Sequence, residues 1–121
     1  MIGVSDLEKL ARSCLTKLFP LFREEHFVRV HHNHVGYRTI NAERFNYTHF
    51  DLQLEGDVCY LLTINLEKEE RGKGNGWKLY ESVHEFARQA GCKCVRLTPS
   101  GWTSAKETRR SYLLRRGYVP F

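Results

Sequence analysis

The sequence has no long hydrophobic run. No segment of its 121 residues approaches the ~20 consecutive apolar residues that a membrane-spanning helix needs. The N-terminal region also lacks the uninterrupted apolar stretch of a secretory signal, because charged side chains recur through it: Asp6, Glu8, Lys9, Arg12 and Lys17. These absences exclude a membrane-spanning protein, and we expect a cytoplasmic location.

The cysteines lack the spacing of a redox or metal motif. Cys92 and Cys94 are separated by one residue, which gives neither a C-x-x-C pair nor a metal knuckle. Cys14 falls on the apolar stripe of the first expected helix, and Cys59 falls inside an expected strand. We interpret all the cysteines as reduced thiols that pack as small hydrophobic side chains.

The familiar phosphate-binding fingerprints are missing as well, although one segment is rich in glycine. The segment Arg71–Gly76 reads R-G-K-G-N-G, which departs from the G-x-G-x-x-G of dinucleotide-binding loops and from the P-loop pattern. Its alternate glycines nevertheless remove Cβ atoms that would keep the backbone away from a ligand. A helix expected after it would point free N–H groups and its positive dipole end at an anion. Because Arg71, Lys73 and Lys78 add full charges, we predict a pyrophosphate site here.

The elements on either side of this loop follow a clear order. The apolar, β-branched run Val58–Leu66 predicts a buried strand before the loop. Apolar side chains at helical spacing over Trp77–Ala90 predict a helix after it, which Gly91 ends. The remaining elements expected there are a short strand, Cys94–Thr98, and a helix that opens with a capping box at Ser104–Glu107 and ends at Gly117.

The N-terminal half predicts a helix and a hairpin. A capping box at Ser5–Glu8 opens an amphipathic helix that Pro20 ends. Two runs, Phe27–Val30 and Phe45–Glu55, read as strands, and the second turns at Glu55–Asp57 into the strand before the glycine loop. The residues near 31–45 and 99–103 match no pattern and are expected to be loops.

The glycine segment resembles the R/Q-x-x-G-x-G/A signature of the GNAT acetyltransferase family, which Arg71, Gly74 and Gly76 satisfy. The sequence Arg116-Gly117-Tyr118 resembles the R/L-G-F/Y that closes the family's last motif helix. The expected elements of residues 58–119 follow the family's order. Because the chain begins directly with a helix and ends soon after Gly117, it resembles a short or trimmed member of the family.

The length predicts a single domain over residues 1–121. For this domain the resemblance implies an α/β (α+β) GNAT-like fold. Its central sheet would be mixed, mostly antiparallel and twisted, with about three helices flanking it.

The resemblance also implies an N-acetyltransferase that moves an acetyl group from acetyl-coenzyme A to an amine by direct attack. The amine would belong to a protein lysine or N-terminus, a small molecule or a nucleobase. The family holds the pantetheine arm along the strand before the loop and the pyrophosphate on the loop. Carried onto this chain, the coenzyme-binding residues are Ile64, Asn65, Leu66, Arg71, Gly72, Lys73, Gly74, Asn75, Gly76 and Trp77.

Two proton transfers accompany this reaction. The attacking amine must lose a proton, because an ammonium with its usual pKa of ~10.4 has no lone pair at neutral pH. Glu67 is the first choice for the base, although it also fits a solvated charged run, and the alternatives are Asp51, Glu55 and His49. Tyr112 is the candidate acid for the departing thiolate. The family's tyrosine position falls on Leu113, so Tyr112 also fits a core-packing role.

Histidines gather in the N-terminal half, at positions 26, 31, 32 and 34. In a strand, His32 and His34 would point to the same face, a spacing that can place two imidazoles on one metal. A structural metal site needs four ligands, and the cysteines are not obviously close. We therefore expect no metal, and we interpret the histidines as a solvated or acceptor-facing surface, with proton removal as the alternative.

The net charge of +5 allows a different class of function. The last expected helix is basic, with Arg109, Arg110, Arg115 and Arg116, and a basic face can bind nucleic acid. No RNA- or DNA-binding motif accompanies it, so nucleic acid is possible but not favoured. The alternatives to the enzyme are a catalytically inactive binding module of the same fold and a nucleic-acid-binding protein, and a homodimer is possible in any of these cases.

Overall fold

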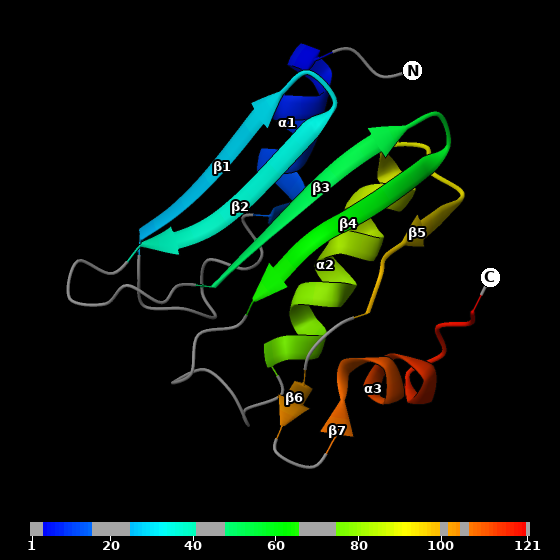
Figure 1. Cartoon of the computed structure of the whole chain (residues 1–121). Helices are drawn as coiled ribbons and strands as arrows, with labels where there is room; N and C mark the ends of the chain where they lie inside the picture. The colour runs from blue at the N-terminus through cyan, green and yellow to red at the C-terminus, as the bar shows by residue number, and fades with distance from the viewer. Residues whose placement is uncertain are drawn as a thin grey trace.

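The computed structural model describes residues 4–15, 25–40, 48–65, 75–99, 102–104 and 107–120, and all structural statements refer to these ranges. Figure 1 shows three helices and a sheet that runs through the centre of the molecule. In chain order the elements are α1 (Val4–Leu15), β1 (Glu25–His31), β2 (His34–Ile40), β3 (His49–Glu55), β4 (Val58–Asn65), α2 (Asn75–Gln89), β5 (Cys94–Arg96), β6 (Trp102–Ser104), β7 (Glu107–Thr108) and α3 (Arg109–Arg115).

The main sheet has five strands in the order β1-β2-β3-β4-β5. The first four strands pair antiparallel, and β5 pairs parallel to β4. A parallel neighbour requires a crossover connection, and α2 supplies it. Strands β6 and β7 form a separate antiparallel pair beside α3. The predicted fold, a mixed and mostly antiparallel sheet with three helices, is confirmed.

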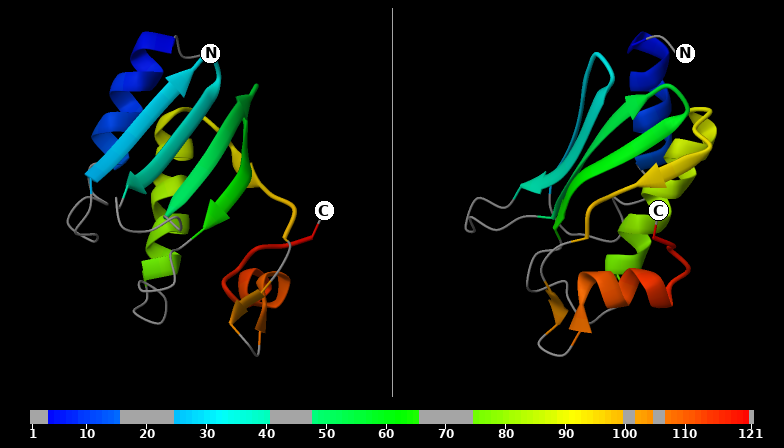
Figure 2. Two further views of the ribbon diagram at one scale, coloured as in Figure 1. Left: turned by 60° about the vertical axis from the view of Figure 1, so that its left-hand side comes forward. Right: turned by 45° about the vertical axis from the view of Figure 1, so that its right-hand side comes forward.

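Helices α1 and α2 cover the same face of the sheet, as both views in Figure 2 show. Alternation in β3 explains which side chains they bury, because Phe50, Leu52 and Leu54 are buried and the residues between them are not. The helices contribute apolar stripes to the same core: Leu7, Ala11, Cys14 and Leu15 from α1, and Leu79, Tyr80, Val83, Phe86 and Ala87 from α2. No described helix covers the other face of the sheet.

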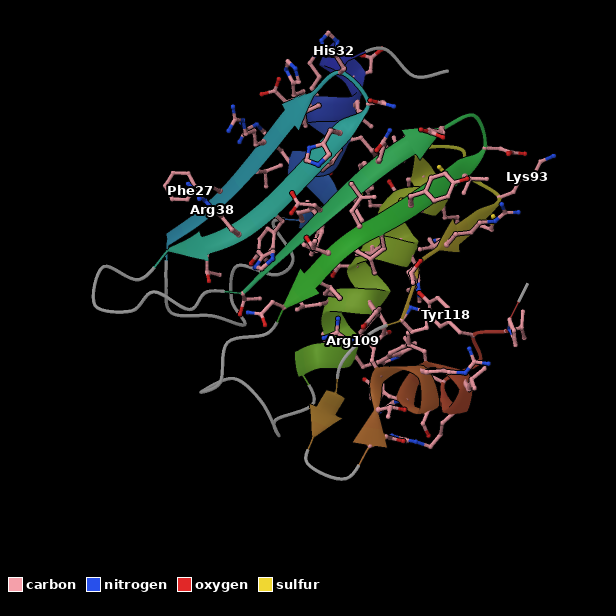
Figure 3. All side chains as sticks on the ribbon, in the orientation of Figure 1. Phe27, His32, Arg38, Lys93, Arg109 and Tyr118 are labelled. Atoms are coloured by element: carbon pink, nitrogen blue, oxygen red, sulfur yellow. The ribbon has the colours of Figure 1, made fainter. Side chains whose placement is uncertain are left out.

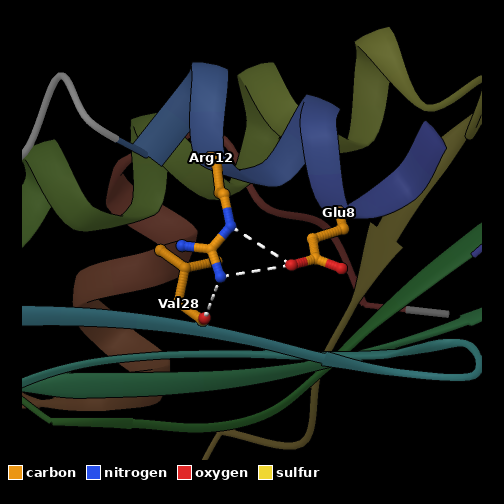
Figure 4. Close-up of polar contacts among 3 residues, drawn as sticks. All are labelled: Glu8, Arg12 and Val28. Atoms are coloured by element: carbon orange, nitrogen blue, oxygen red, sulfur yellow. Dashed lines mark hydrogen bonds and ion pairs between the residues drawn. The ribbon is translucent and has the colours of Figure 1, made fainter. Parts of the chain in front are cut away.

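A polar contact joins α1 to the edge of the sheet. Arg12 lies one turn after Glu8, and its Nη2 is 3.2 Å from the Glu8 Oε1 and 3.4 Å from the carbonyl oxygen of Val28 in β1 (Figure 4). The ion pair is exposed, so it stabilises the fold by at most ~1 kcal/mol. The apolar stripe of α1 therefore provides most of its attachment, and Arg12 helps to fix its position along β1.

Strand β2 corrects the expectation that the residues near 31–45 are loop. Val35, Tyr37 and Thr39 are buried and alternate with partly or fully exposed residues, which is the pattern of a half-buried strand. Strands β1 and β2 are joined by the turn at His32 and Asn33, where His32 has a φ of 53°. His32 and His34 consequently do not share a strand face, which removes the spacing argument for a metal at these histidines.

The start of α3 also differs from the expectation. The capping box predicted at Ser104–Glu107 is wrong, because Ser104 lies in β6 and Glu107 in β7. Thr108 is the N-cap instead, and its hydroxyl oxygen accepts a hydrogen bond from the backbone N–H of Ser111 at 3.2 Å. The predicted ends of the two later helices are confirmed, since Gly91 and Gly117 have φ values of 89° and 103°.

Candidate functional site

Strand β4 changes direction at a bulge. Thr63 pairs with Asp51 of β3 and Leu61 pairs with Leu52, so Leu62 has no partner on β3. Side-chain burial shows the same irregularity. Leu62 and Thr63 are both exposed, whereas neighbouring residues of a regular strand point to opposite faces of the sheet. A bulge bends its strand and re-aims the side chains beyond it.

The bulge coincides with the place where β4 and β5 stop pairing. The two strands are paired from Val58 opposite Cys94 to Tyr60 opposite Arg96, and β4 continues beyond β5 (Figure 1). A cavity of about 210 Å³ lies beyond this point. Its lining comes from the second half of β4, the segment after β5, α2 and the start of α3: Leu61, Leu62, Thr63, Ile64, Tyr80, Leu97, Thr98 and Arg109. We call this space the β4–β5 cavity.

Arg109 is the charged residue of the cavity lining. It is the first residue of α3, and Figure 3 shows it near the end of β4. Its Nη1 donates a hydrogen bond to the carbonyl oxygen of Ile64 at 3.3 Å. Its Nε is buried and has no hydrogen-bond partner. Leaving a buried donor of a charged group unpaired costs free energy, so this atom is a ready donor for a ligand in the cavity.

Tyr80 is the aromatic residue of the lining. It lies on α2 and is only 5% exposed. Burial raises the pKa of the Tyr80 phenol above its ordinary value, while the charge of Arg109 lowers it and Tyr112 raises it further. Since the net shift is upward, the phenol is protonated at neutral pH and is available as a hydrogen-bond or proton donor.

Asp51 connects the uncovered face of the sheet to the cavity lining. Its Oδ2 accepts a hydrogen bond from the hydroxyl of Thr63 at 2.8 Å, and its Oδ1 lies 3.7 Å from the Nε2 of His34. Gly36 faces it on β2, where an added Cβ would lie 3.1 Å from Oδ1. A glycine at this position therefore leaves room for the carboxylate beside the bulge.

The predicted acid, Tyr112, does not line the β4–β5 cavity. It is half-buried, and its ring centroid lies 6.2 Å from those of both Trp77 and Tyr80. The family's tyrosine position, Leu113, is 2% exposed and belongs to the core. Tyr112 as an acid stays a prediction, and the phenol found in the cavity is that of Tyr80.

The glycine loop can be placed only in part. Leu66, Glu67 and the segment 71–74 lie outside the described residues, so the roles predicted for Glu67, Arg71, Gly72, Lys73 and Gly74 stay predictions. Asn75 and Gly76, which were expected in the loop, are instead the first residues of α2, and Trp77 follows them in the helix. Ile64 lines the cavity and Asn65 is the last residue of β4, while their predicted contact with the coenzyme stays a prediction.

The arginines of α3 and its C-cap have different surroundings. Arg109 faces the cavity, Arg115 is hydrogen-bonded to Glu107 at 2.9 and 3.2 Å, and the Arg116 guanidinium lies 5.0 Å from the ring centroid of Trp77. A second cavity, of about 540 Å³, lies between α2, β5 and the C-terminal segment, and Arg116 lines it with Arg88, Lys93 and Trp77. Nucleic-acid binding by this helix stays a prediction.

Sequence reasoning missed Tyr80 and Arg109 as site residues. Tyr80 falls on the apolar stripe of the helix expected over Trp77–Ala90, and Arg109 falls on the expected basic helix. A signal existed for Arg109 alone, because a helix N-terminus favours acidic side chains and disfavours a cation. That signal requires the correct N-cap, Thr108, which the capping-box prediction places at Ser104 instead.

Within the described ranges, no group of three or more His, Cys, Asp or Glu side chains is arranged to hold a metal ion. None of the helices in those ranges has the length and apolar character needed to cross a membrane.

A model of the acetyltransferase (GNAT) family matches residues 6–116, which is most of the chain. The chain belongs to the GNAT family. This confirms the resemblance to the family. GNAT membership supports acetyl transfer as the general activity.

Two solved structures share the GNAT fold of this chain. One, described as "Putative acetyl transferase from Pyrococcus furiosus", is 19% identical with a TM-score of 0.56, and the match covers 100% of this chain and 76% of that one. The other is an aminoglycoside acetyltransferase, meta-AAC0020, from an uncultured soil metagenomic sample, at 13% identity and a TM-score of 0.50, covering 98% and 84% of the two chains. No curated protein sequence matches the chain.

Proposed function

We propose that this protein transfers an acetyl group from acetyl-coenzyme A to an amine, by direct attack of the amine on the thioester. The observation that carries the proposal is the β4–β5 cavity, which lies beyond the last pair of β4 with β5, beside the bulge at Leu62. A strand edge without a neighbour offers its backbone groups to an extended ligand. The pantetheine arm would lie along Ile64, Asn65 and Leu66, with the pyrophosphate on the glycine loop before α2.

The attacking amine has to be neutral, and Asp51 is the described carboxylate best placed to take its proton. It is hydrogen-bonded to Thr63, which lines the cavity, so a proton can reach it through that hydroxyl or a water molecule. Glu55 pairs opposite Val58 at the far end of the hairpin, which argues against it. Glu67 remains the first choice from the sequence, and His49 remains an alternative at the near end of β3.

The departing thiolate can take a proton from a phenol or from solvent, because a thiol with a pKa near ~8.5 is a tolerable leaving group at neutral pH. Tyr112 is the acid expected from the sequence. Tyr80 is the alternative that the lining of the cavity supports.

The acceptor is an amine of a protein lysine or N-terminus, a small molecule or a nucleobase. The name of meta-AAC0020 gives aminoglycosides as the acceptors of that protein, but at 13% identity its likeness to this chain concerns the fold alone. A panel that contains a lysine peptide, a polyamine, an aminoglycoside and a nucleoside would test these classes side by side.

Calorimetry with acetyl-coenzyme A tests the proposal directly. We expect the wild-type protein to bind the coenzyme and Gly74→Asp to lose binding, because a side chain and a negative charge would enter the predicted pyrophosphate site. Gln89→Glu is a suitable control, since Gln89 is exposed at the opposite end of α2 and the substitution also adds one negative charge. Equal affinity in wild type and Gly74→Asp would contradict the proposed binding mode and favour the non-catalytic alternatives.

A further inference from the structure

We propose that Arg109 is a catalytic residue of this site: its guanidinium donates a hydrogen bond to the carbonyl oxygen of the thioester and stabilises the negative charge that develops there. The inference rests on the proposed acetyl transfer and deepens it. In the step concerned, the amine lone pair forms a bond to the carbonyl carbon and the π electrons move onto the oxygen. The C=O bond then re-forms, the C–S bond breaks with its electron pair going to sulfur, and the nitrogen loses a proton to the base.

The position of the guanidinium is the first argument. Arg109 is the one cationic side chain among the described lining residues of the β4–β5 cavity, and its Nη1 is fixed on the Ile64 carbonyl at 3.3 Å. This hydrogen bond holds the group beside the strand edge along which the acyl donor would lie. A carbonyl oxygen has two lone pairs, so Ile64 can accept from Arg109 and from a coenzyme amide at the same time.

The unpaired donor is the second argument. The Nε of Arg109 is buried without a hydrogen-bond partner, and it is the single buried side-chain nitrogen or oxygen in that state among the described residues. A donor that is already desolvated and held in place needs little reorganisation when charge appears on a nearby oxygen, which is the condition under which such groups accelerate acyl transfer most.

The dipole of α3 gives no reason for a cation here. Arg109 is the first residue of α3, where the helix dipole favours an acidic side chain, and the first turn contains none. Its charge is nevertheless felt inside the cavity, since it lowers the pKa of the Tyr80 phenol against the effect of burial. The placement therefore costs the helix some stability and puts a positive potential at the reaction centre.

Two other roles would use the same contacts. Arg109 could simply tie α3 to the end of β4, or it could bind a carboxylate at the end of a longer acyl group. A structural tie predicts loss of stability without a specific loss of turnover. Carboxylate recognition predicts that a dicarboxylic acyl donor such as succinyl-coenzyme A is preferred over acetyl-coenzyme A.

The test compares Arg109→Gln and Arg109→Lys with the neighbouring Arg110→Gln. Arg110 is exposed and does not line the cavity, so its variant removes the same charge from the same turn of the same helix. Measurements are kcat and KM with acetyl-coenzyme A and the best acceptor of the panel, the calorimetric Kd for coenzyme A, and the melting temperature. We expect Arg109→Gln to lower kcat ~10²- to 10³-fold with the Kd within a few-fold of wild type. Arg109→Lys should recover part of the loss, and Arg110→Gln should behave as wild type.

Several results would overturn the inference. An unchanged kcat in Arg109→Gln would do so, as would equal losses in Arg109→Gln and Arg110→Gln. If Arg109→Gln does not fold, Arg109→Lys decides, and wild-type turnover per binding site combined with a lowered melting temperature would assign Arg109 the structural role. A wild-type preference for succinyl-coenzyme A that disappears in Arg109→Gln would assign it carboxylate recognition. Failure of the wild-type protein to bind acetyl-coenzyme A or acetylate any amine would instead overturn the proposed function, and this inference with it.

Discussion

The two halves of strand β4 have different surroundings. Before the bulge, Val58–Tyr60 is paired with β3 on one side and β5 on the other, and the side chains of Cys59 and Leu61 enter the core. After the bulge, Thr63–Asn65 keeps its pairing with β3 but has lost β5, and a cavity takes the place of the missing neighbour. One strand therefore stabilises the sheet in its first half and, under the proposed function, offers a binding edge in its second.

The paired first half of β4 supports the open edge of its second half. An open strand edge is a liability in a sheet unless something covers it or makes use of it. Here the first half of β4 is held from both sides, which fixes where the second half lies. The groups gathered around the second half, namely Asp51, Tyr80 and Arg109, come from β3, α2 and α3, so three elements must dock correctly before the site exists.

The contrast between the two halves of β4 should produce its largest effect at Leu61 and Leu62. Leu61 is 5% exposed, so Leu61→Ala should lower the free energy of unfolding by the ~2–5 kcal/mol typical of emptying a core leucine site. Leu62 is 50% exposed at the bulge, and Leu62→Ala removes the same atoms but should change stability by less than ~1 kcal/mol. Urea denaturation of the two variants measures the difference. Similar losses of unfolding free energy in the two variants would mean that Leu62 does not separate a core half of β4 from an exposed half.

Substitutions around the second half of β4 should instead lower kcat. Asp51→Asn keeps the shape of the side chain but removes the base, so kcat should fall by ~10²-fold or more while urea stability stays close to wild type. Thr63→Val should show a smaller loss, because it interrupts the contact between Asp51 and the cavity. Glu55→Gln changes a carboxylate of the same strand at its other end and should leave kcat near the wild-type value. A large loss in Glu67→Gln with a silent Asp51→Asn would return the role of base to Glu67.

The regular helices and strands around β4 could be predicted from the sequence, whereas the irregular turns could not. The hairpin of β3 and β4, helix α2 and its end at Gly91 follow from alternation, helical spacing and glycine, all of which are local signals. Strand β2 also alternates, yet it was missed because the turn before it places His32, not a glycine or an asparagine, at positive φ.

Only the parts of the site that are contiguous in the sequence could be predicted. The glycine loop and the edge at Ile64 are contiguous sequence, and the resemblance to the family depended on them. Tyr80 and Arg109 meet across a distance of 29 positions in the chain, and no local pattern connects two such residues. Their proximity depends on α3 beginning at Arg109, after a β6–β7 pair that no sequence pattern predicts.

The smallest expected effect distinguishes two tyrosines that lie next to each other. Tyr80 lines the β4–β5 cavity, whereas Tyr112 packs beside it with its ring centroid 6.2 Å away. Tyr80→Phe should lower kcat by ~10-fold, a modest loss for a general acid because solvent can protonate a thiolate whose conjugate acid has a pKa near ~8.5. Tyr112→Phe keeps the ring contacts with Trp77 and the cation–π contacts with Arg115 and Arg116, so both kcat and the melting temperature should stay near wild type. Steady-state kinetics at matched coenzyme saturation, with the melting temperature of each variant, checks both expectations. The opposite ranking, with a larger loss in Tyr112→Phe than in Tyr80→Phe, would mean that the hydroxyl of Tyr112 reaches the sulfur when the coenzyme is bound, and the acid predicted from the sequence would then be correct.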